Sequence, residues 1–575
     1  MEGTIWDWEA EERDRRLVET AYQRLRIWRE GCREIHDRAR EARRIILLND
    51  PRQDGPGTPP NRRTLQLQTL KSTVVNAIAD QMDNMPEALV LPERLELNDV
   101  ADELTDVMRF ILAQNDYEQV HRRRVEDLFV TGTAILQVAW DPDMDGGHGN
   151  IAVIRWPVEN FLWDPASADL DGARALFKVS WHPLSWFSAH YGEQGAKVHG
   201  EDHDYDEVGR PDAQEDSAAD EEKALLLEYW YRTYDRQRRR YAVHCAHIAG
   251  GVLLEHRQDV FGHGQYPFIV NTYSAIEGMP VGEGMVQELA PMMRYVNRYA
   301  HYIDENLRMA SKARMLVSES AQVDLAALTD WQNDVITGKR IDEDSVRWLQ
   351  SRPFGATAAQ QMLQMQTDMK QDSGQNQFTR GEIAGGVTAA SAISALQEAG
   401  GKMTRLYTAV LNYGFRQMAV QILWLVNQFY GEERVRLITG RDGVAREIQI
   451  SANHLMGRDL PPRLPPEVEQ RLYELPLEQQ VEVVRHTAPQ PGGVLPPPPY
   501  SVQVQVQKRN PLRVQAQNEL MIQAFHMAAE AGQPFGTDVL FEMMNVDGKE
   551  QILAALRQAK REMALAEPLP PEVAP

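Results

Sequence analysis

Residues 132–181 read GTAILQVAWDPDMDGGHGNIAVIRWPVENFLWDPASADLDGARALFKVSW. Two runs rich in Val, Ile and Trp, at 133–140 and 150–156, flank a polar turn of Asp, Gly and Pro, which is the pattern of two strands joined by a loop. A third run at 175–181 has the same character. We therefore predict a β-rich part in this region of the chain.

The residues that follow extend the β-rich part. Further strands are predicted over 225–235, 239–249 and 252–256. Gly250-Gly251 suits a tight turn between the last two, and a short helix is predicted over 185–191. Residues 201–222 hold eleven acidic residues, one Arg and few apolar side chains. We interpret them as a solvated loop rather than as a mimic of DNA.

Helical periodicity surrounds the β-rich part, with apolar residues recurring every three to four positions. The helical segments are 8–48, 65–83, 97–130 with a joint at Asn115-Asp116, 284–313, 356–373, 388–430, 511–531, 536–545 and 548–565. A hairpin is predicted over 434–450. Val502, Val504 and Val506 alternate with Gln, which predicts a half-buried strand over 500–507. We therefore expect a fold of the α+β class, mainly helical.

The overall charge limits the classes of function. The chain has 575 residues, of which 61 are basic and 84 acidic, giving a formal net charge of −23. Gripping nucleic acid over much of the surface needs cationic patches, so a strongly acidic chain is unsuited to that role. The charge remains compatible with a protein that lets DNA pass without holding it.

Cysteine count and hydropathy bear on location. The chain has two cysteines, Cys32 and Cys245, too few for a disulfide framework or a structural zinc site. Its first residues, MEGTIWDWEAEERDRR, lack the apolar core of a secretory signal. No run reaches the roughly 18 consecutive apolar residues that a membrane helix needs. We therefore expect a soluble protein with no membrane insertion.

Two segments carry residue types that bind metals. The turn DPDMDG (141–146) matches the start of a calcium loop, but position twelve is Ala152 instead of a bidentate acid, and strands flank the turn. His244 faces the side of its strand opposite to both Cys245 and His247, so one metal cannot use either pair. We therefore predict no metal site and no cofactor.

Patterns of catalytic residues do not emerge either. The glycine-rich segment 381–386 precedes a helix, but Val387-Thr388 stands where a phosphate loop has its Lys and Ser or Thr. The sequence contains no Gly-x-Ser-x-Gly nucleophile elbow. Among 84 acidic residues no pair stands out as a general acid and base. We expect no enzymatic activity and, in particular, no ATP hydrolysis.

Tyr295, Tyr299 and Tyr302 fall on one face of the predicted helix 284–313. Together with nearby arginines they offer a surface on which bases could stack. Packing against a neighbouring helix is the commoner role for such a face, and it is the interpretation that we adopt.

Three segments, in this order, resemble the portal or head-to-tail connector proteins of tailed double-stranded DNA bacteriophages, the short-tailed-phage branch in particular. Residues 132–181 are similar to the wing strands of that family and their Asn-Phe-x-x-Asp-Pro turn. PVGEGMVQELAPMMRYVNRYAHYIDENLRMASKARMLV (280–317) is similar to the descending stem helix and the start of the clip. GEIAGGVTAASAISALQEAGGKMTRLYTAVLNYGFRQMA (381–419) is similar to the tunnel loop and long wing helix. The resemblance spans roughly residues 65–450.

The resemblance implies a portal-type subunit with an α/β wing, a two-helix stem, a small α/β clip, a long wing helix and a helical C-terminal crown. By position these parts are the wing at 1–283, the stem helices at 284–313 and 353–373, the clip at 314–352, the tunnel loop at 374–388, the long wing helix and hairpin at 389–460, a Pro-rich connection and strand at 461–507, and the crown with a frayed tail at 508–575. The implied tunnel-facing residues are Gln375, Asn376, Gln377 and Arg380, and the implied clip contacts are Asp330, Trp331, Asp334, Lys339 and Arg340.

The function that the resemblance implies is a homo-oligomeric ring, twelve-fold in the family, at a unique capsid vertex of the virion. Its channel serves DNA packaging by the terminase and later genome ejection, and its outside is the platform for tail proteins. The implied partners are the terminase large subunit, tail adaptor proteins, capsid and scaffolding proteins, and double-stranded DNA in the channel, with assembly in the host cytoplasm.

Two other classes of function compete with this one. A head-tail adaptor or scaffold ring without direct DNA contact would share the helices but would not need a polar tunnel loop. A nucleic-acid enzyme would need clustered acids, a phosphate loop or a metal set on rigid elements.

Overall fold

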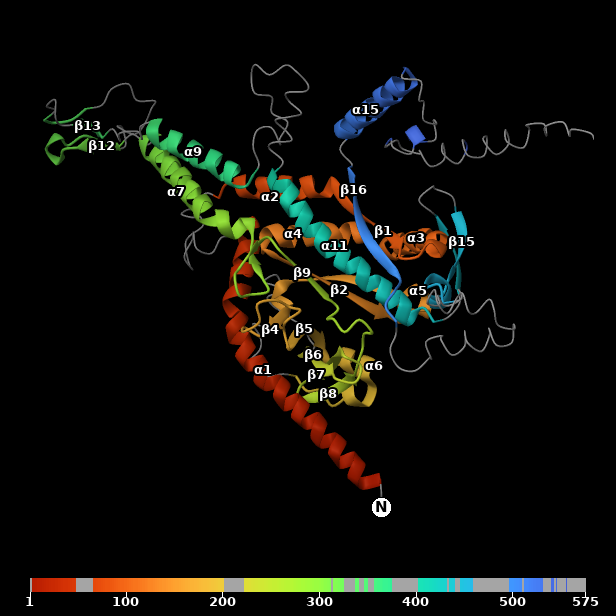
Figure 1. Ribbon diagram of the computed structural model, residues 1–575. Coiled ribbons are helices and arrows are strands. Elements are labelled where there is room, and N and C mark those ends of the chain that lie inside the picture. The colour runs from red at the N-terminus through yellow and green to blue at the C-terminus, as the bar shows by residue number, and fades with distance from the viewer. Residues whose placement is uncertain are drawn as a thin grey trace, which may run out of the picture. The chain divides into compact units, whose positions relative to one another are not determined.

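The structure is a computed structural model (Figure 1) that describes residues 3–47, 66–200, 222–311, 314–324, 337–340, 346–349, 356–374, 402–431, 434–439, 445–458, 496–508, 511–530, 539–541, 544 and 555. The chain folds as two compact units. The first unit comprises Met1–Arg40, Ala77–Gly284 and Met403–Pro575, and the second comprises Glu41–Asn76 and Met285–Lys402. Within the described ranges, no helix combines the length and the apolar character that crossing a bilayer requires.

A five-stranded antiparallel sheet is the largest sheet of the first unit. Its strands, in spatial order, are β4 (Phe161–Trp163), β5 (Ala175–Pro183), β6 (Lys223–Asp235), β7 (Arg240–Ala249) and β8 (Val252–Arg257). The strands predicted over 175–181, 225–235, 239–249 and 252–256 are therefore confirmed. Gly250 and Gly251 form the predicted tight turn with φ of 54° and 75°, a region that favours glycine.

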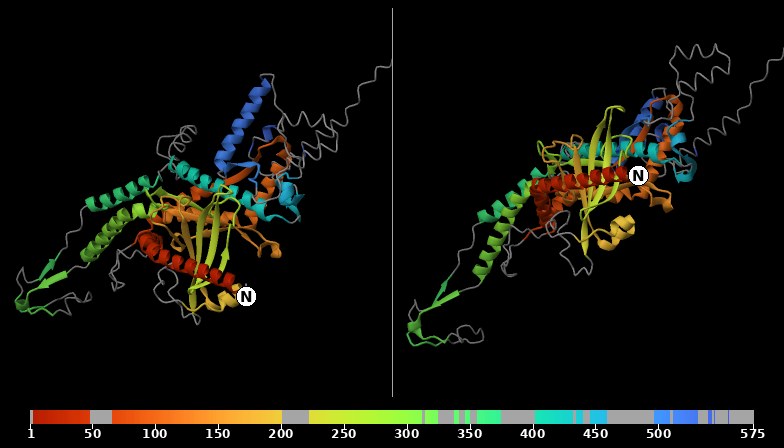
Figure 2. Two further views of the ribbon diagram at one scale, coloured as in Figure 1. Left: turned by 60° about the horizontal axis from the view of Figure 1, so that its bottom comes forward. Right: turned by 90° about the horizontal axis from the view of Figure 1, so that it is seen from below.

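Helix α1 (Gly3–Ile46) lies along this sheet (Figure 2). Trp28 of α1 packs edge-on against Phe177 of β5, with ring centroids 5.4 Å apart. About two helical turns further along α1, His36 places its Nε2 2.9 Å from the carbonyl oxygen of Phe161 in β4. The predicted helix 8–48 is confirmed, and its apolar stripe exists because this face meets the sheet.

A three-stranded sheet in the order β3-β2-β9 forms a second layer of the first unit. It consists of β2 (Thr133–Asp141), β3 (Asn150–Trp156) and β9 (Phe268–Thr272). The predicted hairpin is confirmed, with Val138 opposite Val153. Its turn contains the short helix α5 (Met144–Gly147). Strand β9 was not predicted, because its sequence FIVNT is a short apolar run without alternation.

Two helices precede the hairpin, α3 (Asn98–Gln114) and α4 (Tyr117–Val130), and α2 (Thr69–Met82) lies before them in the chain. The joint falls at Asn115-Asp116 as predicted, with Asp116 left-handed at φ 46°. The Asn115 side chain donates to the carbonyl of Ile151 and accepts from the N–H of Val153, both at 2.8 Å. The joint is therefore fixed to the free edge of β3.

Strand β1 (Asn84–Pro92) pairs antiparallel with β16 (Tyr500–Lys508), so Val90 lies opposite Val502. The predicted half-buried strand is confirmed, because Val502 is buried and Gln503 is exposed. Strand β1 was not predicted, since Pro86 and Glu87 interrupt its apolar pattern.

The remaining elements of the first unit include helix α11 (Lys402–Phe429), which confirms the later part of the helix predicted over 388–430. The predicted hairpin is present as β14 (Arg434–Thr439) and β15 (Ala445–Ile450), and the helix predicted from 511 is α15 (Pro511–Glu530). The shorter elements are η2 (Leu95–Leu97), η3 (Val158–Asn160), α6 (Leu184–Gly195), β10 (Ser274–Ala275), β11 (Gly282–Glu283) and α12 (Ala452–Leu455). The predictions for 201–221, 388–401 and 461–495 concern residues outside the described ranges, as do most of 536–565.

Helix α11 is held by a fully buried guanidinium. Arg124 of α4 donates from Nη2 to Asn271 Oδ1 at 2.5 Å and to the carbonyl oxygen of Leu411 at 3.0 Å. Asn271 of β9 in turn donates to the carbonyl oxygen of Val410 at 3.0 Å. Gly414 passes these two side chains so closely that an added Cβ would lie 2.3 Å from Asn271 Oδ1 and 2.5 Å from Arg124 Nη2.

Replacing Gly414 by Ala is expected to destabilise the protein by about 1–3 kcal/mol, because the new methyl group must displace a buried, hydrogen-bonded pair. The sign of the stability change is informative, because a Gly to Ala replacement inside an ordinary helix stabilises the protein by about 1 kcal/mol. Urea unfolding followed by circular dichroism measures the change.

The matched control is Gly431→Ala, one residue past Tyr430 at the end of α11, where an added Cβ meets nothing within 4 Å. This variant is expected to change stability by less than about 1 kcal/mol. A stabilised Gly414→Ala variant would show that Arg124 and Asn271 do not constrain the helix.

Candidate channel and docking segments

The second unit contains a pair of helices joined at one end by a strand pair. Helices α7 (Met285–Ser311) and α9 (Ala356–Asp372) lie side by side in every view (Figures 1 and 2). Strand β12 (Arg314–Val317) pairs antiparallel with β13 (Val346–Leu349), and η5 (Glu319–Ala321) follows β12. Because β12 and β13 are paired, the chain between them forms a closed excursion from the helix pair.

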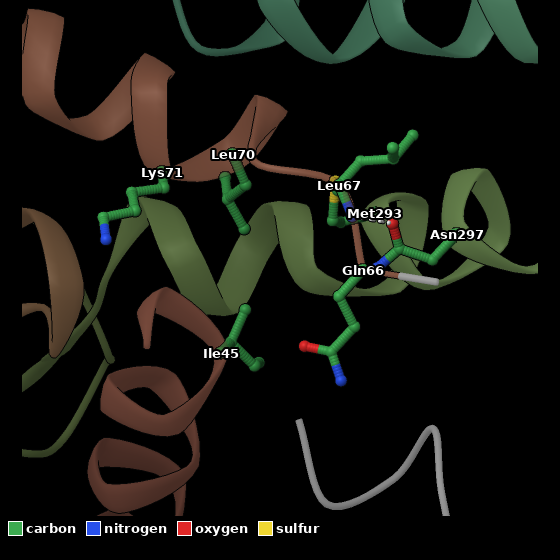
Figure 3. Close-up of a pocket in the computed structure, with 7 residues that line it drawn as sticks. All are labelled: Ile45, Gln66, Leu67, Leu70, Lys71, Met293 and Asn297. Carbon is green, nitrogen blue, oxygen red and sulfur yellow. Dashed lines mark hydrogen bonds between the residues drawn. The ribbon is translucent and has the colours of Figure 1, made fainter. Parts of the chain in front are cut away.

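The first half of α7 is anchored within the second unit by polar contacts. Arg294 forms a half-buried ion pair with Glu41, and Asn297 accepts a 3.0 Å hydrogen bond at Oδ1 from the N–H of Leu67. A small cavity beside these contacts has room for about one water molecule (Figure 3). Its lining consists of Ile45, Gln66, Leu67, Leu70, Lys71, Met293 and Asn297. These contacts position α7 within the second unit.

The excursion holds the residues that the resemblance assigns to partner contacts. Lys339 and Arg340 are described and both are exposed to solvent. Asp330, Trp331 and Asp334 lie outside the described residues. Two cationic side chains are thus accessible at this excursion.

The polar loop after α9 is described only at its edges. Helix α9 is closed by Ser373, whose hydroxyl donates to the carbonyl of Lys370 at 2.7 Å, and by Gly374 at φ 76°. This is the left-handed residue that commonly ends a helix. The tunnel candidates, Gln375, Asn376, Gln377 and Arg380, lie outside the described residues, and the chain is described again from Lys402.

The three tyrosines of α7 are not equally packed within the described part of the chain. Tyr299 is half-buried, as expected for a packed face, whereas Tyr295 is 53% exposed and Tyr302 is 48% exposed. The guanidinium of Arg298 lies over the Tyr295 ring at 5.4 Å. The helix instead buries Met285, Leu289, Met293, Val296 and Ala300. One helix buries only one face in its own unit, and these tyrosines lie on another.

Titratable groups of the first unit are perturbed chiefly by burial. Burial lowers the pKa of His121 to about 3 and that of His263 to about 4, with Arg124 and Arg240 adding to the effect. Burial likewise raises the pKa of Tyr500 to about 12. Core packing produces such shifts without any catalytic partner, so they do not mark an acid–base pair.

The two segments that carry metal-binding residue types, the DPDMDG turn and strand β7, differ in the contacts of their side chains. Asp145 of the DPDMDG turn forms an ion pair with Arg436 of β14, so its carboxylate joins the turn to the second hairpin. His244 is on the expected side of β7, 2.8 Å from the hydroxyl of Thr233. On the other side Cys245 and His247 share a face with Glu228, and the three donor atoms lie within 4.8 Å of one another.

The sequence pattern did not predict this set, because the only metal-binding pairs considered were His244 with Cys245 and His244 with His247. The alternation of Cys245 and His247 was the available indication, because residues two apart share a strand face. The third member, Glu228, comes from the adjacent strand β6 and becomes a neighbour only through the register.

A comparison with protein families identifies the family of the chain. A search of curated proteins finds nothing similar to the chain. A family model described as "Phage P22-like portal protein" matches residues 4–575, which covers nearly the whole sequence. The match includes the helix pair, the excursion, the two sheets and the C-terminal helix. The chain belongs to the phage P22-like portal protein family.

Proposed function

We propose that this chain is the subunit of a portal ring at a unique capsid vertex, through which DNA enters the head during packaging and leaves during ejection. The family match over residues 4–575 carries the proposal. The paired helices α7 and α9 with the strand pair β12–β13 support it, because a two-helix stem that ends in a compact clip is what the resemblance implies.

The parts of the proposed subunit follow from this assignment. Helices α7 and α9 are the stem, and residues 314–352 are the clip, which docks the terminase large subunit and later the tail adaptors. The loop 374–388 faces DNA, and α15 belongs to a crown inside the head. Capsid and scaffolding proteins surround the ring in the virion, and assembly takes place in the host cytoplasm.

The charge of the chain fits passage of DNA better than capture. Each phosphate that a protein neutralises adds salt-dependent retention, which would oppose movement of DNA of any sequence. The chain carries −23, and the loop 374–388 offers Gln, Asn and a single Arg. The side chains of this loop act by polar contact, and the protein breaks no bond.

Subunit contacts in the proposed ring need apolar surface that a single chain leaves open. The exposed rings of Tyr295 and Tyr302 on α7 provide such surface. An aromatic face with a hydroxyl at its rim suits an interface that is partly hydrated. We assign this face to contact between neighbouring subunits, twelve in a ring.

Electron microscopy of the purified chain tests the assembly. End-on views are expected to show a ring with a central hole wide enough for a B-form duplex. A protein that stays monomeric under every condition tried would contradict the proposal.

Deleting 374–388 is expected to leave ring assembly intact and to impair packaging or retention of DNA, because the loop is polar, rich in glycine and placed between α9 and α11. Packaged DNA per particle is the measurement. A matched control replaces the same residues by a Gly/Ser linker of equal length, which preserves the spacing. Normal packaging by both variants would favour an adaptor ring without DNA contact.

Alanine at Trp331, Lys339 or Arg340 is expected to weaken docking of the terminase or an adaptor more than ring formation. For Trp331 the loss is expected to reach about 2 kcal/mol, since Trp and Arg dominate interface energies. The exposed cations Lys197 and Arg236 of the first unit serve as controls, because their replacement removes the same charge elsewhere. Equal affinity of the clip variants and the controls would exclude the clip as the docking surface.

A further inference from the structure

A row of polar side chains crosses the five-stranded sheet on the face next to α6. Lys178 of β5 lies opposite Glu228 of β6, Glu228 opposite His247 of β7, and His247 opposite Glu255 of β8. Cys245 shares this face with His247. Polar groups on an inward face cost free energy unless partners satisfy them. We therefore asked what these side chains bind.

Three members of the row bring together donors that suit one metal ion. A carboxylate oxygen of Glu228, the sulfur of Cys245 and a ring nitrogen of His247 lie within 4.8 Å of one another. In a tetrahedral zinc site with bonds of about 2.0–2.3 Å, ligand atoms are about 3.3–3.8 Å apart. Side-chain movements of about 1 Å would therefore bring the three donor atoms to the spacing of zinc ligands.

Neighbouring side chains hold both polar ligands in place. Lys178 Nζ lies 2.6 Å from Glu228 Oε1, and Trp230 Nε1 donates a 3.3 Å hydrogen bond to Glu228 Oε2. The Tyr191 hydroxyl of α6 lies 2.8 Å from His247 Nδ1, and Glu255 Oε2 lies 3.7 Å from the same nitrogen. Metal-binding carboxylates and imidazoles are typically oriented by such partners.

We propose that Glu228, Cys245 and His247 form a site for a borderline divalent cation, with Zn²⁺ as the preferred ion. A thiol with an imidazole selects zinc over magnesium or calcium, which prefer oxygen ligands alone. The fourth position is taken by water. The ion ties β6 to β7 beneath α6, and this role is independent of the proposed portal function.

Binding replaces a proton by the metal. Burial keeps the pKa of the Cys245 thiol well above its usual value, so the free site holds a neutral thiol. On binding, the thiol proton passes to the buffer and the sulfur forms the bond to the ion. The carboxylate of Glu228 and the new thiolate offset two of the three positive charges that the cation and Lys178 bring to the site.

Cobalt(II), a spectroscopic substitute for zinc, tests the site in the full-length protein. After chelator treatment and dialysis, one Co²⁺ per chain is expected to produce a sulfur-to-cobalt charge-transfer band and the visible bands of tetrahedral cobalt. Added Zn²⁺ is expected to displace it, and Zn²⁺ is expected to raise the unfolding temperature.

The chain offers a matched control, since it has two cysteines. Cys245→Ser is expected to lose the charge-transfer band, whereas Cys32→Ser keeps it, because Cys32 lies on α1 and contacts the carbonyl of Trp163. His247→Gln and Glu228→Gln are each expected to weaken zinc binding at least about tenfold, and Tyr191→Phe, which removes an orienting partner, about tenfold. Circular dichroism confirms that each variant folds.

Folded wild-type protein without a sulfur-to-cobalt band would overturn the proposal. So would a band that survives in Cys245→Ser and disappears in Cys32→Ser. If Cys245→Ser does not fold, His247→Gln and Glu228→Gln decide the matter, and unchanged zinc affinity in both would equally refute it.

Discussion

The buried guanidinium of Arg124 constrains how the first unit is put together. A charge that is fully removed from water is tolerated only where hydrogen bonds replace its hydration. Here the bonds go to Asn271 of β9 and to the backbone of α11, so three elements that are distant in sequence must keep one geometry. The centre of α11 is thereby fixed, while Met403 and Leu406 near its start remain exposed.

A second fixed point lies where the chain leaves the first unit. Gly132, at φ 79°, lies so close to the backbone of Gly282 and Glu283 that an added Cβ would be 2.3–2.4 Å from it. Thr133 reinforces the contact by accepting a 3.0 Å hydrogen bond at Oγ1 from the N–H of Gly282. The end of the first unit that precedes α7 is therefore held mainly by backbone, and only glycine fits there.

Local pattern predicted much of the fold because many elements carry their own periodicity. The hairpin β2–β3 and the strand β16 alternate or cluster apolar residues, and α1 and α11 repeat at helical spacing. Strand β1 was not predicted from the local pattern, because Pro86 and Glu87 interrupt it. The strand forms because it pairs with β16, which lies about 400 residues later in the chain. The Glu228–Cys245–His247 set was not predicted for a related reason, since it depends on the register of two strands, which is a tertiary property.

The exposed face of α7 also shows what local spacing cannot predict. Spacing placed Tyr295 and Tyr302 on one face correctly, but spacing does not say whether a face packs within one chain or stays open. The channel and docking candidates rested on the resemblance, and the part of the chain described here includes Lys339 and Arg340 among them.

The pairing of β1 with β16 has a consequence for the timing of synthesis. Pro92 finds its partner in Tyr500, about 400 residues later, and at about 5–20 residues per second a ribosome needs roughly 20–80 s to cover that interval. Throughout that time the edge of β1 lacks its native neighbour on the nascent chain. The sheet formed by β1 and β16 is thus completed only near the end of synthesis, after most of the chain has already been made.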